Sequence, residues 1–500
     1  MKRVLVANRG EIALRIIRAC HEEGLEAVAV YSSADRRSLH VQAADYAVLI
    51  GPPPPAESYL RGDMLIDAAR RTGAEAIHPG YGFLSERAAF AAAVEQAGLT
   101  FIGPPASAIQ AMGDKTEARR RMAEAGVPIV PGTTVPAVDV ASLAKVAGKL
   151  GFPVVIKAAA GGGGRGMRVV SRTEDLANAL TTASSEALKA FGDGSVYVEK
   201  YIERPRHVEI QVLADHERTI HLGERECSVQ RRHQKLVEEA PSVAVTPALR
   251  ESMGNAAVAA ARAVGYRSAG TCEFLLGSDG SFYFLEMNTR IQVEHPVTEM
   301  VYGVDLVREQ LRIARGLPMS IPREALSPRG WAIECRLTSE DPANGFLPST
   351  GRITYLRPPS GHGVRWDGGI GPGDEIALYY DSLLGKLIVW APDREQARKK
   401  MIRALDELML AGVSTNLSFH RRLMADGEFS RGEIDTQFLD RRGDLMGGAI
   451  SEDHAMVAAV AAALAEEDAR QRRRPRPGSD GEKGNGGSAW TRTGRAEGLR

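Results

Sequence analysis

A strand, a helix and a second strand occupy the first 31 residues and set the fold class. Residues 3–7 are typical of a buried strand, and residues 11–23 repeat apolar side chains at helical spacing until Gly24 ends the helix. Residues 27–31 form the next predicted strand. Because so short a unit belongs to a parallel sheet, we expect an α/β N-terminal domain. The turn after the first strand is not GxGxxG, which leaves dinucleotide binding unsupported.

A polar hairpin follows much later in the chain. Residues 271–276 and 281–285 are predicted strands joined by a tight turn. Glu286 and Asn288 project to one side of an extended chain, and Glu273 can lie beside them if the strands pair. Two carboxylates and a carboxamide oxygen suit Mg²⁺ or Mn²⁺. Two solvated acidic side chains on a hairpin are the alternative.

A glycine run lies between two other predicted strands. Residues 152–157 end in Lys157, residues 161–164 are four glycines, and residues 167–170 form the next strand. Consecutive glycines cannot pack a core, so we interpret them as a flap whose N–H groups close on phosphates; a flexible hairpin tip is the alternative. The chain has no Walker A motif, which excludes the P-loop fold.

Two further segments carry polar residues. Residues 207–213 alternate polar and apolar side chains, which predicts a half-buried strand of an antiparallel sheet. Residues 224–235 form a dense polar and basic run, which by itself is typical of a solvated face.

Composition limits the partners and the compartment. With 63 basic and 63 acidic residues the chain has no net field to attract nucleic acid or a membrane. Its 500 residues, 44% hydrophobic, predict roughly three domains. The four cysteines lie far apart and are predicted to be buried thiols. No leader or long apolar segment is evident, so we expect a cytoplasmic protein.

Successive motifs resemble those of biotin carboxylase, in the family's order, across residues 2 to about 442. They are NRGEIA at 8–13, HPGYGFLSE at 78–86, MGDK at 112–115, the glycine run, RHVEIQ at 206–211, QRRHQK at 230–235, EMNTRIQVEHP at 286–296, ECR at 334–336 and YYDS at 379–382. The resemblance implies an α/β and α+β multidomain protein with an ATP-grasp fold, a Rossmann-like N-terminal domain, a mobile glycine-rich lid and a β-rich C-terminal domain. The implied boundaries are 1–114, 115–316 with the lid at about 131–203, and 330–442, followed by a helix-like and then disordered tail at 443–500.

The resemblance also implies the roles of individual residues toward ATP and metal. The nucleotide-binding positions are Lys115, Lys157, Gly163, Gly164, Glu199, Lys200, Tyr201, Ile202, His207, Gln230 and His233, together with Glu273 and Glu286. Glu273, Glu286 and Asn288 match the ligands of two Mg²⁺ or Mn²⁺ ions, in agreement with the hairpin argument.

For the reaction itself, the resemblance implies a bicarbonate pocket and a base. Lys235, Arg290, Gln292 and Val293 match the pocket, with Val293 acting through its backbone. Glu294 matches the base that deprotonates bicarbonate, whose attack on the γ-phosphate gives carboxyphosphate. Arg336 matches the group that stabilises the biotin oxyanion, so the catalytic positions are Lys235, Arg290, Glu294 and Arg336. Glu294 as a structural partner of Arg290 or Arg336 is the alternative.

The implied partners are a biotin carboxyl carrier protein and carboxyltransferase subunits. No Met-Lys-Met occurs in the chain, so we expect biotin on a separate polypeptide. Acetyl-CoA carboxylase in fatty acid biosynthesis is the expected holoenzyme, and propionyl-CoA, methylcrotonyl-CoA and pyruvate carboxylases are the alternatives. A homodimer is expected, although His362 stands where the family has an aromatic at the dimer contact, beside Arg365 and opposite Arg18 and Glu22.

Two other functional classes are compatible with parts of the pattern. Another ATP-grasp ligase, such as half of a carbamoyl phosphate synthase, should lack the run 290–294 together with Arg336. An inactive nucleotide-sensing subunit should lose a metal ligand or Glu294, and all of these are present.

Overall fold

The computed structural model describes residues 1–133, 137–158, 167–322 and 327–447, and of the tail residues 456, 460, 463, 464, 466, 467 and 470. Residues 1–447 form one compact unit, and residues 448–500 are a second unit. In the tail, Met456, Val460 and Leu464 are helical and exposed, in keeping with the predicted helix. None of the helices described is both long and apolar enough to cross a membrane.

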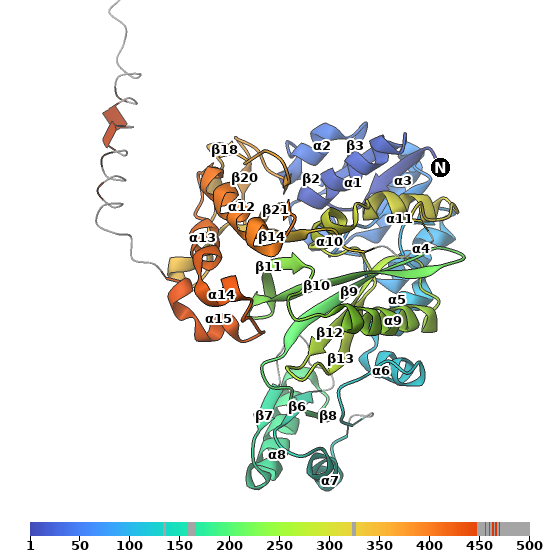
Figure 1. The fold of residues 1–500 in the computed structure, drawn as a ribbon. Coiled ribbons are helices and arrows are strands. Elements are labelled where there is room, and N and C mark those ends of the chain that lie inside the picture. Colours follow the sequence, from blue (N-terminus) through green and yellow to red (C-terminus); the bar gives the residue numbers. More distant parts are fainter. Residues whose placement is uncertain are drawn as a thin grey trace, which may run out of the picture. The chain divides into compact units, whose positions relative to one another are not determined.

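The N-terminal region is a parallel sheet flanked by helices, as predicted (Figure 1). Its five strands run in the order β3-β2-β1-β4-β5. The elements are β1 (Arg3–Val6), α1 (Gly10–Glu22), β2 (Glu26–Ser32), α2 (Leu39–Ala43), β3 (Tyr46–Gly51), α3 (Gly62–Thr72), β4 (Ala76–His78), α4 (Ala88–Gln96), β5 (Thr100–Phe101) and α5 (Ala106–Gly113).

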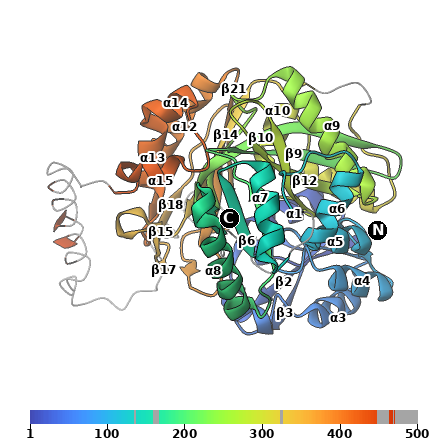
Figure 2. The ribbon, with the colours of Figure 1, turned by 90° about the horizontal axis from the view of Figure 1, so that it is seen from below.

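A small three-stranded sheet, in the order β7-β6-β8, follows in the chain. Helices α7 and α8 pack against it and against each other (Figure 2), around a core that includes Leu143, Ile156 and Leu180. The elements are α6 (Lys115–Glu124), α7 (Val140–Leu150), β6 (Val154–Ala158), β7 (Met167–Val170), α8 (Thr173–Phe191) and β8 (Val196–Lys200). Both strands predicted around the glycine run are present, whereas the glycines themselves lie outside the described residues.

An eight-stranded antiparallel sheet, in the order β13-β12-β9-β10-β11-β14-β21-β19, runs through the centre of the unit (Figure 1). Strand β11 pairs with β14, so the sheet continues across the predicted boundary near residue 330. The elements are β9 (Arg206–Ala214), β10 (Thr219–Arg231), β11 (Gln234–Ala240), α9 (Pro247–Ala263), β12 (Ser268–Leu276), β13 (Phe282–Asn288), α10 (His295–Tyr302), α11 (Leu306–Ala314), β14 (Trp331–Thr338), β19 (Val364–Gly368) and β21 (Leu383–Ala391).

Short strand pairs and helices complete the β-rich C-terminal region. A hydrophobic core that includes Leu387, Met401 and Phe438 joins the sheet to these helices. The remaining elements are β15 (Glu340–Asp341), β16 (Leu347–Pro348), β17 (Gly351–Arg352), β18 (Tyr355–Arg357), β20 (Glu375–Ile376), α12 (Arg394–Glu407), β22 (Met409–Ala411), α13 (Leu417–Ala425), α14 (Gly427–Arg431) and α15 (Phe438–Arg441). The four cysteines are free and buried, which confirms that prediction.

Two expectations about exposure are wrong. Strand β9 is not half-buried: the polar Glu209 and Gln211 are as inaccessible as their apolar neighbours. The polar run at 224–235 is a solvated face only at its turn: residues 224–230 in β10 are buried, whereas Arg232, His233 and Gln234 are exposed. The reason is the same for both strands: they are neighbours within the sheet, and their polar side chains satisfy one another instead of water.

Candidate active site

Lys235, at the start of β11, is surrounded by three carboxylates. Its Nζ lies 2.6 Å from Glu209 Oε2, 2.9 Å from Glu273 Oε1 and 2.7 Å from Glu294 Oε1. Strands β9 and β12 place Glu209 and Glu273 in direct register, and Glu294 follows β13. All three donors of the ammonium are therefore used. Burial alone would lower the pKa of Lys235, but the three carboxylates outweigh it and raise this pKa well above its ordinary value.

Glu294 connects Lys235 to Arg336 of β14. While one oxygen accepts from Lys235, the other accepts from Arg336 Nη2 at 2.9 Å, and Arg336 Nε also donates to Glu238 Oε1 at 2.6 Å. Burial would raise the pKa of Glu294, yet the charges of Lys235, Arg336 and Arg225 hold it well below its ordinary value. Glu294 is thus a buried carboxylate that stays ionised between two cations. The contact between Glu294 and Arg336, which the sequence analysis gave as a structural alternative to the catalytic role, is present.

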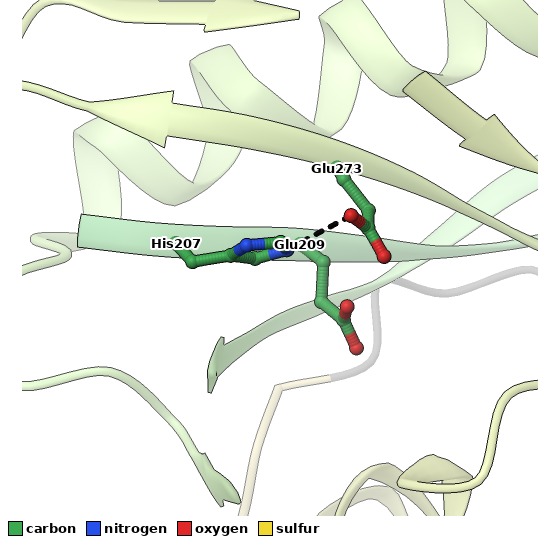
Figure 3. A group of neighbouring side chains, drawn as sticks. All are labelled: His207, Glu209 and Glu273. Atoms are coloured by element: carbon green, nitrogen blue, oxygen red, sulfur yellow. Dashed lines mark ion pairs between the residues drawn. The ribbon is translucent and has the colours of Figure 1, made fainter. Parts of the chain in front are cut away.

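Glu273 of β12 contacts four side chains. Besides Lys235, its Oε1 accepts from Asn288 Nδ2 at 2.9 Å and from Gln292 Nε2 at 2.8 Å. Its Oε2 lies 3.0 Å from His207 Nε2. Figure 3 shows His207 and Glu209 on β9, with Glu273 on the strand beside them and directed at the imidazole ring. Each of these three residues offers a ligand atom within 4.8 Å of the other two.

The hairpin expected to bind metal is formed as predicted. Strand β13 extends through Glu286 to Asn288, and Glu286 stands directly opposite Glu273 of β12. Like charges in cross-strand positions repel, so a cation between the two carboxylates would relieve the pair. Asn288 adds a carboxamide, whose nitrogen donates to Glu273 and whose oxygen accepts from Arg290 in this structure. The donor set therefore fits a divalent cation that prefers oxygen ligands.

Arg290 pairs with a residue from a distant loop rather than with Glu294. Its Nε donates to Glu86 Oε2 at 2.9 Å, and its Nη2 donates to Asn288 Oδ1 at 2.8 Å. The sequence motif that ends at Glu86 gave no role for this residue. The backbone carbonyl of Val293 accepts from Lys386 Nζ at 2.8 Å. The predicted pocket residues at 290–294 are therefore hydrogen-bonded to Glu86 of the N-terminal region and to Lys386 of the C-terminal region.

The residues predicted to bind the nucleotide include a second ionic group, on the three-stranded sheet. Glu199 of β8 accepts from Lys157 Nζ of β6 at 2.6 Å and from Arg119 Nη1 of α6 at 2.6 Å. Lys200 donates to the backbone carbonyls of Gly151 and Phe152 at 3.2 Å.

The other predicted nucleotide positions are more scattered. The hydroxyl of Tyr201 accepts from Gln437 at 2.8 Å, and Ile202 is half-buried. Gln230 is buried near the end of β10, whereas His233 is exposed in the turn before β11 with φ 66°. Gly163, Gly164 and the side chain of Lys115 lie outside the described residues.

Four buried residues of the site were not singled out from the sequence. They are Glu209, Gln211, Arg225 and Glu238. Glu209 and Gln211 lie in the motif RHVEIQ at 206–211. For Arg225 the available signal was the presence of charged residues in a segment that otherwise resembles a strand. Burial raises the pKa of Glu238 to about 7, although Arg336 acts to lower it.

Family profiles match three consecutive parts of the chain. They are the biotin carboxylase N-terminal domain at residues 1–109, the ATP-binding domain of the carbamoyl-phosphate synthase L chain at 114–321, and the biotin carboxylase C-terminal domain at 334–441. Biotin carboxylase 1 of Bacillus subtilis is 52% identical over 89% of this chain and 100% of its own length. One pyruvate carboxylase subunit of Methanothermobacter thermautotrophicus is 52% identical over 91% of this chain and 94% of its own length.

A solved structure is similar over the same region. It is the biotin carboxylase domain dimer of the Hydrogenobacter thermophilus 2-oxoglutarate carboxylase, in complex with MgADP, ADP and bicarbonate. It is 48% identical, covers 90% of this chain and 99% of its own chain, and has a TM-score of 0.83.

Proposed function

This chain belongs to the biotin carboxylase family of ATP-grasp, ATP-dependent ligases that serve biotin-dependent carboxylases, and from that premise we propose how its Lys235 site works. The overall reaction converts ATP, bicarbonate and biotin to ADP, phosphate and carboxybiotin. The observation that carries the proposal is Glu294, one carboxylate held between Lys235 and Arg336. In this proposal Glu294 is the proton acceptor, Lys235 is the cation that faces bicarbonate, and Arg336 is the cation that faces biotin.

In the first step, Glu294 accepts the bicarbonate proton and the resulting oxyanion attacks the γ-phosphorus of ATP, which gives carboxyphosphate and ADP. Glu294 is a weak base while both cations face it. A bound anion draws the charge of Lys235 toward itself, and this restores the basicity of Glu294. Arg290, Gln292 and the backbone of Val293 orient the bicarbonate, and Lys115 and Lys157 offset charge on the phosphates.

In this proposal separate sets of residues bind the metal ions and the nucleotide. Glu273, Glu286 and Asn288 would hold two Mg²⁺ or Mn²⁺ ions, which when bound neutralise developing negative charge on the phosphates. The nucleotide is bound by the segment 199–202 with His207, Gln230, His233, Gly163 and Gly164.

In the second step, carboxyphosphate breaks down to CO₂ and phosphate. The phosphate takes the N1′ proton of biotin, and the nitrogen forms a bond to CO₂ while Arg336 stabilises the ureido oxyanion. Arg336 is suited to this role because two buried carboxylates, Glu238 and Glu294, fix its guanidinium.

The proposal extends to the assembly. Biotin is presented by a separate carrier protein, a carboxyltransferase uses the carboxybiotin, and acetyl-CoA is the proposed acceptor in fatty acid biosynthesis. The relatives named above include a subunit of a pyruvate carboxylase and a domain of a 2-oxoglutarate carboxylase, so membership of the family does not by itself determine the acceptor. In this proposal the carboxyltransferase partner decides it, and propionyl-CoA, methylcrotonyl-CoA and pyruvate are the alternatives. We also propose a cytoplasmic homodimer.

Bicarbonate-dependent ATP cleavage, measured with and without free biotin, tests the proposed reaction. We expect slow cleavage with bicarbonate alone, faster cleavage with biotin, and carboxybiotin as product. Carbamoyl phosphate formation or complete inactivity would contradict the proposal. For the acceptor, the native holoenzyme should be captured through a tag on this chain and supplied with acetyl-CoA, propionyl-CoA, methylcrotonyl-CoA or pyruvate in parallel. Preference for any acceptor other than acetyl-CoA would refute that part.

A further inference from the structure

We propose that Arg225 is a positioning residue for bicarbonate capture, an inference that rests on the roles proposed above for Lys235 and Gln292. Arg225 lies in the middle of β10 and is 0% exposed. Its guanidinium makes five hydrogen bonds to side-chain oxygens. They go to Glu209 Oε1 from Nε, to Gln211 Oε1 at 2.7 Å, to Thr298 Oγ1 at 3.0 Å, to Thr271 Oγ1 at 3.0 Å and to Gln292 Oε1 at 2.9 Å.

One arm of this network leads to Lys235 through Glu209. The first carboxylate oxygen of Glu209 accepts from Arg225, and the second accepts from Lys235 Nζ at 2.6 Å. Arg225 therefore takes up part of the negative charge that Lys235 would otherwise face alone. If Arg225 were lost, Glu209 would bind the ammonium more strongly and leave less of its charge for a bound anion.

The other arm sets the orientation of Gln292. Arg225 has only donors, so the side-chain oxygen of Gln292 must face it and the amide nitrogen must point away. That nitrogen donates to Glu273 Oε1 at 2.8 Å. Without Arg225, the contact to Glu273 alone would hold this orientation, and the side-chain oxygen of Gln292 would lose its donor. Arg225 thus fixes two of the groups proposed to bind bicarbonate, from a position behind both of them.

A purely structural role is the competing explanation, since Arg225 also ties β9, β12 and α10 together through Gln211, Thr271 and Thr298. A buried guanidinium is a costly way to join these elements when apolar residues could do so. The two explanations differ in what they predict for bicarbonate. Loss of a structural tie lowers stability and turnover, whereas loss of positioning raises the bicarbonate KM selectively.

The test compares Arg225→Lys with Arg394→Lys in the full chain. Arg394 is a matched control: it is a nearly buried arginine of α12 that donates to Glu239 and to the carbonyls of Phe429 and Ser430. For Arg225→Lys we expect a bicarbonate KM raised about tenfold, with the ATP KM within about twofold of wild type. For Arg394→Lys we expect both KM values to be unchanged.

A second variant covers the case in which Arg225→Lys does not fold. Among the described residues, Gln211 is hydrogen-bonded to Arg225 and to the carbonyls of Val212 and Gly270. These hydrogen bonds do not reach Lys235 or Gln292, so we expect Gln211→Met to act on bicarbonate through Arg225 and to raise the bicarbonate KM about threefold, with the ATP KM unchanged.

Combining Arg225→Lys with Gln292→Ala should raise the bicarbonate KM by less than the product of the two single effects, because the arm through Gln292 is common to both and only the arm through Glu209 remains. An unchanged bicarbonate KM in every folded Arg225 and Gln211 variant would overturn the inference. If the wild-type chain itself showed no bicarbonate-dependent ATP cleavage, the proposed function would fail instead, so the two failures are distinguishable.

Discussion

At the scale of single residues, the site is organised by buried carboxylates shared between cations. Glu294 and Glu209 each accept from two cationic side chains, and Lys235 is common to both. This sharing keeps every charge compensated before any substrate binds, which a buried charge requires. If a bound anion displaces Glu209 or Glu294 from Lys235, the displaced carboxylate still accepts from Arg225 or Arg336.

Arg336→Ala should separate the two half-reactions. Without Arg336 the remaining cation at Glu294 is Lys235, so the pKa of Glu294 rises toward its ordinary value and bicarbonate deprotonation is preserved. The biotin oxyanion, however, loses its donor, which costs about 3 kcal/mol, or on the order of a hundredfold in rate. Arg290→Ala should instead depress ATP cleavage and biotin carboxylation together, because it weakens bicarbonate binding.

Both rates and the melting temperature should be measured on these two variants and on Arg336→Lys. The lysine variant keeps a cation beside Glu238 and Glu294 and so controls for stability. Equal loss of both activities in Arg336→Ala, together with a lowered melting temperature, would show that Arg336 is only a structural ion pair.

Glu286→Gln tests the metal ligands. The carboxamide keeps the shape of the side chain opposite Glu273 but removes the charge that attracts a divalent cation. We expect an unchanged melting temperature without metal and ATP turnover lowered by about a hundredfold or more. Turnover near that of the wild type at saturating Mg²⁺ would rule out Glu286 as a ligand.

Glu238 should make stability depend on pH. Burial raises its pKa to about 7, against the opposing charge of Arg336. The folded chain therefore binds this proton more tightly than the unfolded chain, so the stabilisation is complete below the ordinary pKa of 4.5 and is lost as the pH rises through about 7. The carboxamide side chain of the Glu238→Gln variant does not titrate. We expect the wild type to lose on the order of 3 kcal/mol relative to this variant across that interval. Melting temperatures of the two proteins, measured side by side, should diverge with pH; a constant difference would refute the shift.

At the scale of elements, the sequence predicted the positions of the strands far better than the burial of their side chains. Strands β7 and β9 begin and end within one residue of the predicted segments 167–170 and 207–213, because hydrophobic period and turn residues are local signals. The burial of β10 could not be predicted from such local signals. The partners of Arg225 lie 46, 67 and 73 residues further along the chain, at Thr271, Gln292 and Thr298. Only the register of the sheet brings them together.

The contact between α1 and the segment after β19 gives a prediction at this scale. A side chain at Gly369 would place its Cβ 2.4 Å from the backbone nitrogen of Glu11 and 2.6 Å from the carbonyl carbon of Gly10. Backbone cannot yield as a side chain can, so Gly369→Ala should cost about 1–3 kcal/mol by forcing the two elements apart. Gly371→Ala is the control, since its Cβ would meet only Leu39, at 3.7 Å. Thermal unfolding of the two variants should differ clearly; equal melting temperatures would show that the contact adjusts freely.

At the scale of the whole molecule, one sheet joins what the sequence divided into two domains. The site is assembled from both sides of that division: Lys235 and Glu273 come from the first side, and Arg336 comes from β14 on the other. Glu294 bridges them. The motif order along the chain predicted most of these residues, but not that β11 and β14 are paired strands of a continuous sheet. Their pairing fixes the distance between the two cations that Glu294 contacts.

The end of the compact unit gives the last prediction. The sequence predicts a tail that begins at residue 443, yet residues up to Gly447 belong to the unit. Leu445 is 4% exposed within the C-terminal core, and Arg422 donates to the carbonyls of Leu445 and Met446. A chain ending at Gly447 should melt at the temperature of the full chain and carboxylate free biotin at a rate within about twofold of it, because all residues of the proposed site lie within residues 1–447. A chain ending at Arg442 loses the buried leucine and should be less stable by about 1.5–3 kcal/mol. Biotin carboxylation and thermal unfolding of both truncated chains decide the matter. Loss of activity in the chain ending at Gly447, with its melting temperature unchanged, would show that the tail takes part in the reaction.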